Sequence, residues 1–359
     1  METTSPTLLS DLTTLRLGGA AGTLVEARDE PALVAAVREA DRAGEPLLVL
    51  AGGSNVVVAD DGFPGTVVRI ATRGIVRAEE DGGRVALEVQ AGEPWDPFVE
   101  ACVGEGLAGV ECLSGIPGSV GATPIQNVGA YGQEVSESIR SVRVLDRARD
   151  VVEDVPAAAC GFTYRSSVFK RTPGRWVVLR VTFVLKRSPR SAPVRYAELA
   201  RRLGVNIAER APLADVRAAV LALRRGKGMV VDPADPDSVS AGSFFTNPVL
   251  DRAAFAALER RAAERLGDGA RPPAFPEPDG RVKTSAAWLI ERAGFHRGHG
   301  DPRGIAISSK HTLALTNRGD GSTADLVALA REIAGGVRAT FGVDLVPEPV
   351  FVGHAWESA

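Results

Sequence analysis

The amino-acid sequence predicts a chain that mixes helices and strands over two or three domains. Its 359 residues exceed the roughly 100–200 residues of one domain. Short apolar runs such as residues 46–50 predict buried strands, and the spacing of apolar residues over 30–44 predicts an amphipathic helix. A glycine-rich, nearly uncharged run at residues 111–132 fits neither pattern, and we expect it to be the backbone around which the fold is organised.

Composition narrows the classes of function. A net charge of −3 with 24% charged residues favours neither nucleic acid nor a membrane surface as a partner. No apolar run approaches the roughly 20 residues of a bilayer span, and the start METTSPTLLSDLTTLRLGG does not resemble a signal peptide. Three cysteines without CxxC spacing form no disulfide framework, and four histidines show no metal-ligand spacing. We therefore expect a cytoplasmic globular enzyme without a metal.

The first half of the chain reads mainly as strands. Strands are predicted at residues 23–29, 46–50, 56–59, 65–70, 75–78, 84–90 and 176–186, and a hairpin at 141–146 and 151–155. Helices are predicted at residues 30–44 and 94–106, and residues 65–90 are expected to form one small sheet. The segment AGGSN at residues 51–55 joins two strands, as phosphate loops do. It lacks the GxGxxG and GxxxxGK[ST] patterns, so a plain turn remains an alternative.

The second half reads mainly as helices. They are predicted at residues 212–225, 251–266, 284–293 and 322–341, the third capped by Thr284 or Ser285 and the last by a capping-box-like Ser322 and Asp325. Short strands are expected at residues 305–307 and 313–316, and an irregular loop at 267–280. The turn-rich segment DPADPDS at residues 232–238 is a candidate domain boundary.

The run at residues 111–132, ECLSGIPGSVGATPIQNVGAYG, has five glycines, two prolines and one charge. Glycine and proline disfavour a helix there by about 1 and 3 kcal/mol relative to alanine. Glycine also permits close backbone approach and positive φ, and successive N–H groups in such turns bind anions. We expect this run to line the phosphates and ring edge of a nucleotide cofactor, although a buried structural turn is the simpler alternative.

Five motifs together resemble the UDP-N-acetylenolpyruvoylglucosamine reductase family. They are AGGSNV at residues 51–56, GIPGSVGATPIQNVGAYG at 115–132, YRSSVFK at 164–170, GSFFTNP at 242–248 and LVPEPV at 345–350. The resemblance implies an α+β fold: an FAD-binding domain of the vanillyl-alcohol-oxidase type in two subdomains, and a separate α+β substrate-binding domain. The implied boundaries are residues 1–73, to which 347–359 return, 74–231 and 232–346.

The resemblance also implies the reaction and its cofactors. The family uses NADPH and FAD to reduce an enolpyruvyl ether on a UDP-sugar to a lactyl ether, during peptidoglycan precursor synthesis, which supports cell shape and division. It implies a monomer that binds the UDP-sugar and NADPH. The residues implied to contact FAD are Gly52, Gly53, Ser54, Asn55, Gly115, Pro117, Gly118, Ser119, Gly121, Gln126, Asn127, Ala130 and Tyr131.

Three residues carry the implied catalysis. Hydride addition leaves negative charge on the substrate's α-carbon and carboxylate, which Arg165 would stabilise through charge-assisted hydrogen bonds. Glu348 would have to be protonated to help, and Ser243 would donate the proton to carbon. Lys227 is one candidate for the cation that acidifies Ser243.

The residues implied to bind substrate are Tyr164, Tyr196, Lys227, Asn247 and Lys283. Tyr196 lies in the extra segment that defines the type I branch of the family. The chain departs from the family pattern in a longer loop between Lys227 and Ser243 and in Pro349 after Glu348. Both departures affect the expected local geometry.

Two other functions remain open. A carbohydrate or alcohol oxidase of the same flavin superfamily would often tether flavin to a histidine or cysteine. No histidine precedes His296, and Cys112 is the only cysteine in the glycine-rich run. A non-catalytic protein that binds a nucleotide sugar or flavin would not need Arg165, Ser243 and Glu348.

Overall fold

The computed structural model describes residues 7–356 and divides them into two compact units. Unit 1 comprises residues 21–53 and 64–226, and unit 2 comprises residues 7–20, 54–63 and 227–356. The predicted division into three domains stays a prediction. Residues 1–6 and 357–359, which belong to the first predicted domain, lie outside the described part of the chain. The prediction that the chain does not start with a signal peptide falls partly on residues 1–6 and so lies partly outside the described residues as well.

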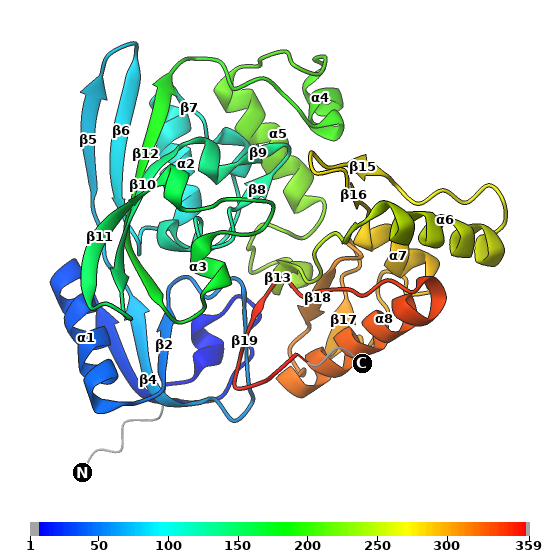
Figure 1. Cartoon of the computed structure of the whole chain (residues 1–359), viewed down its shortest axis with the longest axis horizontal. Coiled ribbons are helices and arrows are strands. Elements are labelled where there is room, and N and C mark those ends of the chain that lie inside the picture. Colours follow the sequence, from blue (N-terminus) through cyan, green and yellow to red (C-terminus); the bar gives the residue numbers. More distant parts are fainter. Residues whose placement is uncertain (1–6, 357–359) are drawn as a thin grey trace. The chain divides into compact units, whose positions relative to one another are not determined.

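Unit 1 contains two larger sheets and one two-stranded sheet (Figure 1). Three strands form the first, in the order β1 (Ala21–Ala27), β4 (Phe63–Ile70), β2 (Leu47–Leu50). The second follows the order β11 (Val151–Pro156), β10 (Ile139–Asp146), β12 (Trp176–Arg187), β6 (Arg84–Gln90), β5 (Ile75–Glu80), and β7 (Leu107–Ala108) also pairs with β12. The central strand β12 alternates in burial over much of its length, because one face of an antiparallel sheet packs on the core, whereas the edge strand β5 is largely exposed.

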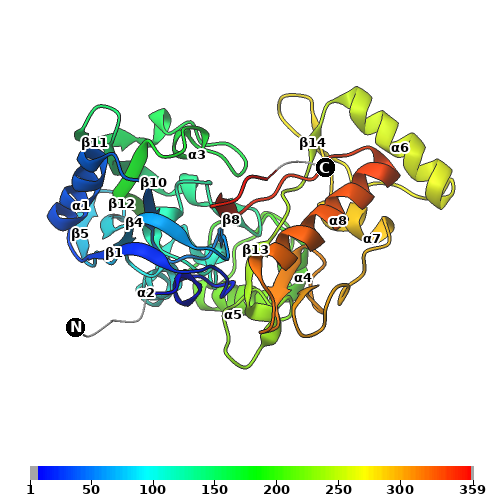
Figure 2. The same ribbon diagram turned by 90° about the horizontal axis from the view of Figure 1, so that it is seen from below.

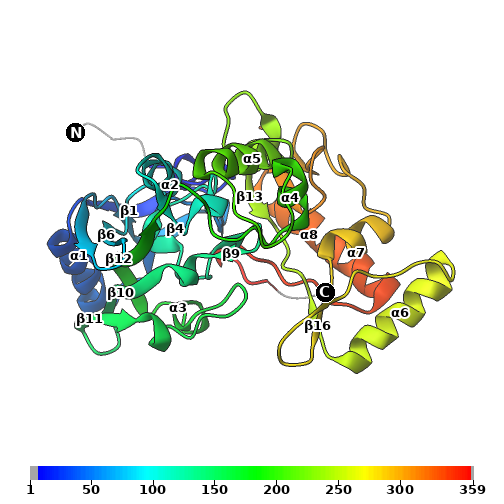
Figure 3. The same ribbon diagram turned by 90° about the horizontal axis from the view of Figure 1, so that it is seen from above.

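Helices cover these sheets in unit 1. The helix α1 (Glu30–Ala43) buries Leu33 and Val37 in the same core as Val68 of β4. The helix α2 (Trp95–Gly104) places Trp95 and Phe98 against Phe183 of β12, with ring centroids 5.2–6.0 Å apart. The other α-helices of unit 1 are α3 (Val168–Arg171), α4 (Ala197–Leu203) and α5 (Leu213–Arg225). The last two pack together around a small separate core, as Figure 3 shows.

Unit 2 contains short strands and three longer helices. One sheet has the order β13 (Ser240–Ser243), β18 (Ala314–Asn317), β17 (Ile305–Ile307), and another has β14 (Val249–Leu250), β16 (Val282–Lys283), β15 (Phe275–Pro276). The strand β19 (Val350–Val352) pairs in parallel with β3 (Val56–Val58). The helix α8 (Thr323–Phe341) packs against α6 (Arg252–Leu266) and α7 (Ala286–Arg292), as Figure 2 shows.

Most predicted elements are confirmed. The segment at residues 46–50 is a parallel strand, the predicted hairpin is β10–β11, Ser285 rather than Thr284 caps α7, and Ser322 and Asp325 form a capping box on α8. One grouping is wrong: β4 belongs to the sheet of β1 and β2, because it pairs in parallel with β2 instead of with β5. The loop expected at residues 267–280 contains the two-residue strand β15.

Several features bear on the class of function. The three cysteines are buried and form no disulfide within residues 7–356. None of the helices in that range is long and apolar enough to cross a membrane. The same range holds no group of three or more His, Cys, Asp and Glu side chains that could bind a metal ion.

The core of unit 1 depends on the cluster of Trp95, Phe98 and Phe183. Phe183 is fully buried. We predict that Phe183→Ala lowers the free energy of unfolding by about 3–5 kcal/mol, because the cavity it leaves adds to the lost transfer free energy. Urea denaturation measures this change. The matched control is Val76→Ala, since Val76 is 63% exposed in the same sheet and its truncation should alter stability little; equal effects would show that this cluster is not central.

Candidate active site

The two glycine-rich loops predicted to hold the cofactor diphosphate meet in unit 1. A Cβ atom on Gly52 would lie 2.6 Å from the Cα atom of Gly118, and one on Gly121 would lie 2.5 Å from the Cβ atom of Ala91. Real Cβ atoms essentially never approach so closely, so both positions require glycine. Trp95 donates its N–H to the Gly118 carbonyl at 3.0 Å, which ties this loop to the start of α2.

These loops offer donors for an anion. Within residues 7–356, the backbone N–H groups of Gly52, Gly53, Gly118 and Ser119 donate to no other residue. The Oγ atom of Ser119 is buried and has no hydrogen-bond partner there either. Buried polar groups in folded proteins are almost always paired. The residues therefore fit an anionic group such as a diphosphate, and the predicted role of both loops stays consistent with the chemistry of their donors.

The segment predicted at the flavin ring is held in strained conformations. Asn127 and Tyr131 have φ of 45° and 51° although neither is glycine. Tyr131 and Gly132 are the turn of a hairpin between β8 (Gly129–Ala130) and β9 (Gln133–Glu134), and a two-residue turn with positive φ at both positions suits the twist of such strands. Strain of this kind persists only where the surrounding structure imposes it, and it clusters at functional sites.

Asn127 is anchored by the protein on all sides of its amide. Its Nδ2 atom donates to Glu134 Oε2 at 2.7 Å and to the Thr163 carbonyl at 3.1 Å, and its Oδ1 atom accepts from the N–H of Ser136 at 3.2 Å. The side chain thus holds the neighbouring backbone in place. The predicted contacts of this segment with the flavin ring stay predictions.

Arg165 lies directly beside this segment. It occupies a tight turn between Thr163 and Ser166 with φ of 52°, and its Nη2 atom donates to the Gly129 carbonyl at 2.9 Å. Its guanidinium also lies over the ring of Tyr164, 5.5 Å from the centroid. A fixed cation therefore stands next to the residues predicted to border the flavin ring.

Arg224 is a second cation at this place, and the sequence analysis missed it. It lies on α5, is 8% exposed, and interacts electrostatically with Tyr131, Asp96 and Arg165. Burial lowers the pKa of Arg224 to about 10, so the side chain stays charged at neutral pH. Burial likewise raises the pKa of Tyr131 to about 12, which keeps its phenol neutral. Two arginines near one another with a neutral phenol favour an anionic ligand.

Ser243 and Glu348 are brought together in unit 2. The segment after Ser243 pairs with the segment before Glu348: Glu348 donates its N–H to the Phe244 carbonyl at 2.8 Å, and Thr246 donates to the Val346 carbonyl at 3.0 Å. On its other side Phe244 donates to the Leu313 carbonyl at 2.7 Å. Residues 105 positions apart in the chain therefore share one small sheet-like region.

Asn55 joins the same region. Its Nδ2 atom donates to the Glu348 carbonyl at 3.3 Å, and its own carbonyl accepts from Val350 at 2.9 Å. The departure at Pro349 is accommodated here, because the proline needs no N–H in a pairing that runs through Glu348 and Val350. Arg165 belongs to unit 1, whereas Ser243, Glu348, Ser54 and Asn55 belong to unit 2.

The predicted substrate-binding residues of unit 2 already have protein partners. The Oδ1 atom of Asn247 accepts from the N–H of Ala286 at 3.0 Å, at the start of α7. Lys283 pairs with Glu277 at 2.6 Å. Lys227 immediately precedes Gly228, which has φ of 65° and packs closely against Asp237. Their binding roles stay predictions.

Tyr196 is the predicted clamp of the type I segment. It is 44% exposed, and its ring meets that of Tyr131 edge-on at 5.5 Å. It is also the residue that precedes the first turn of α4, a helix that the sequence analysis did not predict. The clamp residue therefore contacts the strained hairpin directly.

Comparisons with known proteins agree with the motifs. Residues 233–352 match the family model "UDP-N-acetylenolpyruvoylglucosamine reductase, C-terminal domain", and residues 21–154 match "FAD binding domain". The chain is 59% identical over 345 residues to the UDP-N-acetylenolpyruvoylglucosamine reductase of Thermobifida fusca (strain YX), which is 96% of each chain. It is 60% identical over 349 residues to that of Salinispora arenicola (strain CNS-205), which is 97% of this chain and 95% of the relative.

A solved structure supports the fold. The UDP-N-acetylenolpyruvylglucosamine reductase of Thermus caldophilus matches with a TM-score of 0.65 over 97% of this chain and 98% of its own. The sequence identity is 24%, so this likeness concerns the fold alone.

We call the two loops at Gly52–Gly53 and Gly118–Gly121 the cradle. The close approach of Gly52 to Gly118 gives a direct test of its predicted role in binding the cofactor diphosphate. We predict that Gly52→Ala lowers the affinity for flavin by about tenfold or more, equivalent to about 1.4 kcal/mol, because the added methyl forces the loops apart. Titration of the flavin-free protein followed by flavin fluorescence measures this affinity. Gly104→Ala is the matched control, since a Cβ atom there meets nothing within 4 Å. Unchanged flavin affinity in Gly52→Ala would contradict the assignment of these loops.

Proposed function

Because the chain belongs to the UDP-N-acetylenolpyruvoylglucosamine reductase family, we propose that it reduces UDP-N-acetylenolpyruvoylglucosamine to UDP-N-acetylmuramate with NADPH and FAD. The relatives support the identity of the reaction. One structural observation carries the assignment of chemistry to particular residues: the backbone pairing that holds Glu348 next to the segment of Ser243.

The glycine loops are the proposed FAD site. The unused N–H groups of Gly52, Gly53, Gly118 and Ser119 would bind the diphosphate. When bound, FAD supplies hydride transfer between NADPH and the substrate. The residues from Gln126 to Tyr131 would border its ring.

Arg165 is proposed to stabilise the negative charge that develops on the substrate. Hydride addition to the β-carbon of the enolpyruvyl group places an electron pair on the α-carbon, which delocalises into the adjacent carboxylate. A guanidinium can face that carboxylate through two parallel charge-assisted hydrogen bonds. Its bond to Gly129 and its strained backbone hold it in one orientation, so little reorganisation is needed as charge develops.

Ser243 and Glu348 are proposed to complete the reduction. Ser243 would give its hydroxyl proton to the α-carbon, forming the new C–H bond of the lactyl group. Glu348, in its protonated form, would donate a hydrogen bond to the substrate carboxylate. An alkoxide left on Ser243 needs a nearby cation, and Lys227 is the proposed one.

The remaining residues are proposed to bind the UDP-sugar. Tyr196 is exposed and its ring contacts that of Tyr131 edge-on, which supports the proposal that it closes over a ligand of that hairpin. Tyr164, Lys227, Asn247 and Lys283 would contact the diphosphate and uridine. We further propose a cytoplasmic monomer, in which the reaction serves peptidoglycan synthesis and through it cell shape and division.

The covalent-flavin alternative has no chemical support at Cys112. This thiol is buried, and burial raises the pKa of Cys112 well above its ordinary value, so little thiolate is available as a nucleophile. No observation favours an oxidase over the reductase.

The two half-reactions separate the roles of these residues. We predict that Ser243→Ala is reduced by NADPH at the wild-type rate, whereas reoxidation of its flavin by the enolpyruvyl substrate slows by about 10²–10³. The reason is that only the second half-reaction needs a proton on carbon. Stopped-flow flavin absorbance measures both rates.

Ser322→Ala is the control for this experiment. Ser322 caps α8, so its loss should cost about 1 kcal/mol of stability and leave both half-reactions unchanged. Equal slowing of both half-reactions in Ser243→Ala would remove Ser243 from the proton-donor role. A wild-type protein whose reduced flavin is not reoxidised by the substrate would overturn the proposed function itself.

A further inference from the structure

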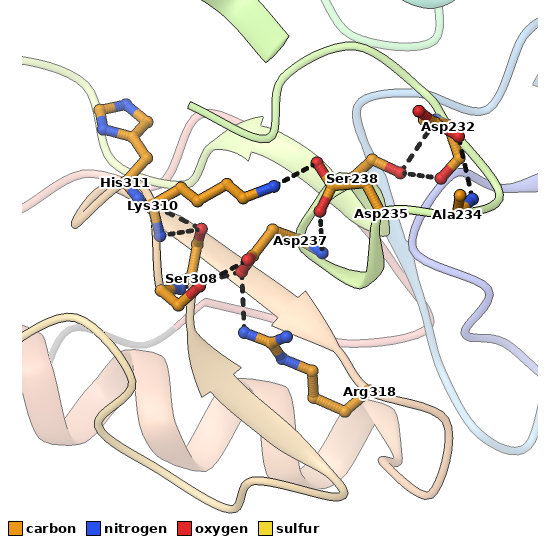
Figure 4. A network of polar contacts seen from close by, with 10 residues as sticks. Asp232, Ala234, Asp235, Asp237, Ser238, Ser308, Lys310, His311 and Arg318 are labelled. Carbon is orange, nitrogen blue, oxygen red and sulfur yellow. Dashed lines mark hydrogen bonds and ion pairs between the residues drawn. The ribbon is translucent and has the colours of Figure 1, made fainter. Parts of the chain in front are cut away.

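Asp237 is a buried carboxylate in the loop between Lys227 and Ser243, which the sequence analysis expects to be longer than in the family. It lies on the short 3-10 helix Pro236–Ser238 and is 3% exposed. Charged side chains are almost never fully buried unless they are paired. The partners of its carboxylate come from outside its own loop, among them Arg318 in Figure 4.

Its two oxygens accept three hydrogen bonds from two distant segments. Oδ1 accepts from the N–H of Ser309 at 2.9 Å and from Nη2 of Arg318 at 2.7 Å, and Oδ2 accepts from Oγ of Ser309 at 2.6 Å. Burial by itself would raise the pKa of Asp237, but the hydrogen bonds from Ser309 and the charge of Arg318 lower it below its ordinary value. The carboxylate is therefore ionised at neutral pH and firmly bound.

These partners flank a single strand. Ser309 lies in the loop between β17 and β18, and Arg318 directly follows β18, so Asp237 ties the loop that leads into β18 to the residue that ends it. The strand β18 pairs with β13, the strand that contains Ser243. In this pairing Ser240 lies opposite Thr316, and Ser243 lies opposite Ala314. The carboxylate thus fixes the partner strand of the proposed proton donor.

The register of Ser243 needs such a constraint. The pairing of β13 with β18 is irregular between Ser240 and Ser243, and Gly242 has φ of 75° in that stretch. A bulge re-aims the side chains that follow it, and a one-residue slip would turn Ser243 to the other face. Without fixed ends, the short strand β18 would define the position of the Ser243 hydroxyl poorly.

Asp237 also touches the segment that carries Lys227. A Cβ atom on Gly228 would lie 2.7 Å from the Cβ atom of Asp237, so the two residues pack without space for a side chain. The rest of the loop is fixed on both sides: Lys310 pairs with Asp235 at 2.8 Å, and Ser238 Oγ donates to the Asp232 carbonyl at 2.8 Å (Figure 4).

We propose that Asp237 is a positioning residue for the reaction, which holds the β17–β18 loop through Ser309 and the end of β18 through Arg318 and thereby aims Ser243 and seats Lys227. Asp237 touches no reacting atom in this proposal. The inference rests on the proposed function, because it assigns Asp237 to the proton-donating half of that reaction.

The variant Asp237→Asn tests this inference. It keeps the shape of the side chain and removes the charge that faces Arg318. We expect flavin reduction by NADPH to proceed as in the wild type and reoxidation by the enolpyruvyl substrate to slow by about 10–100-fold, since a small displacement of a catalytic group has effects of that size. Amide hydrogen exchange should also accelerate in β13 and β18, a readout that does not depend on activity.

The loop supplies a matched control. Asp232→Asn changes an exposed carboxylate five positions earlier, whose Oδ1 accepts only from Ala234 within the same turn, and it should change neither half-reaction. Arg318→Gln should reproduce the effect of Asp237→Asn, and the double variant should be no worse than either, because the two residues act as one unit. If Asp237→Asn does not fold, Ser309→Ala removes a single bond and should slow the same half-reaction alone.

Two results would overturn the inference while leaving the proposed function standing. One is equal slowing of both half-reactions, which would mean a general loss of structure. The other is unchanged reoxidation with unchanged hydrogen exchange. Failure of the wild-type protein to be reoxidised by the substrate would instead refute the proposed function, and the exchange experiment would still decide whether Asp237 orders β13 and β18.

Discussion

The contact between the backbones of Gly52 and Gly118 is the constraint on which the proposed cofactor site of unit 1 depends. Two loops that are 66 positions apart approach so closely that neither tolerates a side chain at these residues. The same packing leaves neighbouring N–H groups and the Ser119 hydroxyl without protein acceptors in the described chain. A protein that leaves buried donors unpaired loses stability unless a ligand accepts from them. The unpaired donors of the cradle are therefore best explained by an anionic ligand that accepts hydrogen bonds from them.

Three of the five described non-glycine residues of unit 1 with positive φ lie in or beside the segment predicted to border the flavin ring. Asn127, Tyr131 and Arg165 adopt positive φ, and each is fixed by contacts to a different part of the same unit: Asn127 to Thr163, Tyr131 to Tyr196 and Arg165 to Gly129. Each such conformation costs on the order of 1–3 kcal/mol. Three together are explained if the gain is a rigid arrangement of a cation and a backbone edge, which is what charge stabilisation during hydride addition requires.

The sequence could predict the features that local chemistry determines. The capping box of Ser322 and Asp325, the cap by Ser285 and the parallel strand β2 follow from short patterns, and the structure confirms them. The importance of Arg224 could not be predicted, because an arginine at a helix C-terminus has the same local pattern whether it is exposed or buried. The bonds of Asp237 could not be predicted either, since its partners lie 72 and 81 positions away.

The two departures from the family pattern illustrate the same limit. A proline after Glu348 and a longer loop after Lys227 both threaten the expected geometry when they are considered as sequence. In the structure, Pro349 falls where the pairing with Asn55 needs no N–H, so Glu348 keeps its backbone bonds. The longer loop carries its own constraints, with Asp235 paired to Lys310 and Asp237 to Arg318. The pair of Asp237 and Arg318 is largely buried, so this loop is tied to the residue that ends β18. For that reason we regard the loop at residues 228–242 as an ordered part of unit 2 that contacts the sheet of Ser243, which is the basis of the role proposed for Asp237.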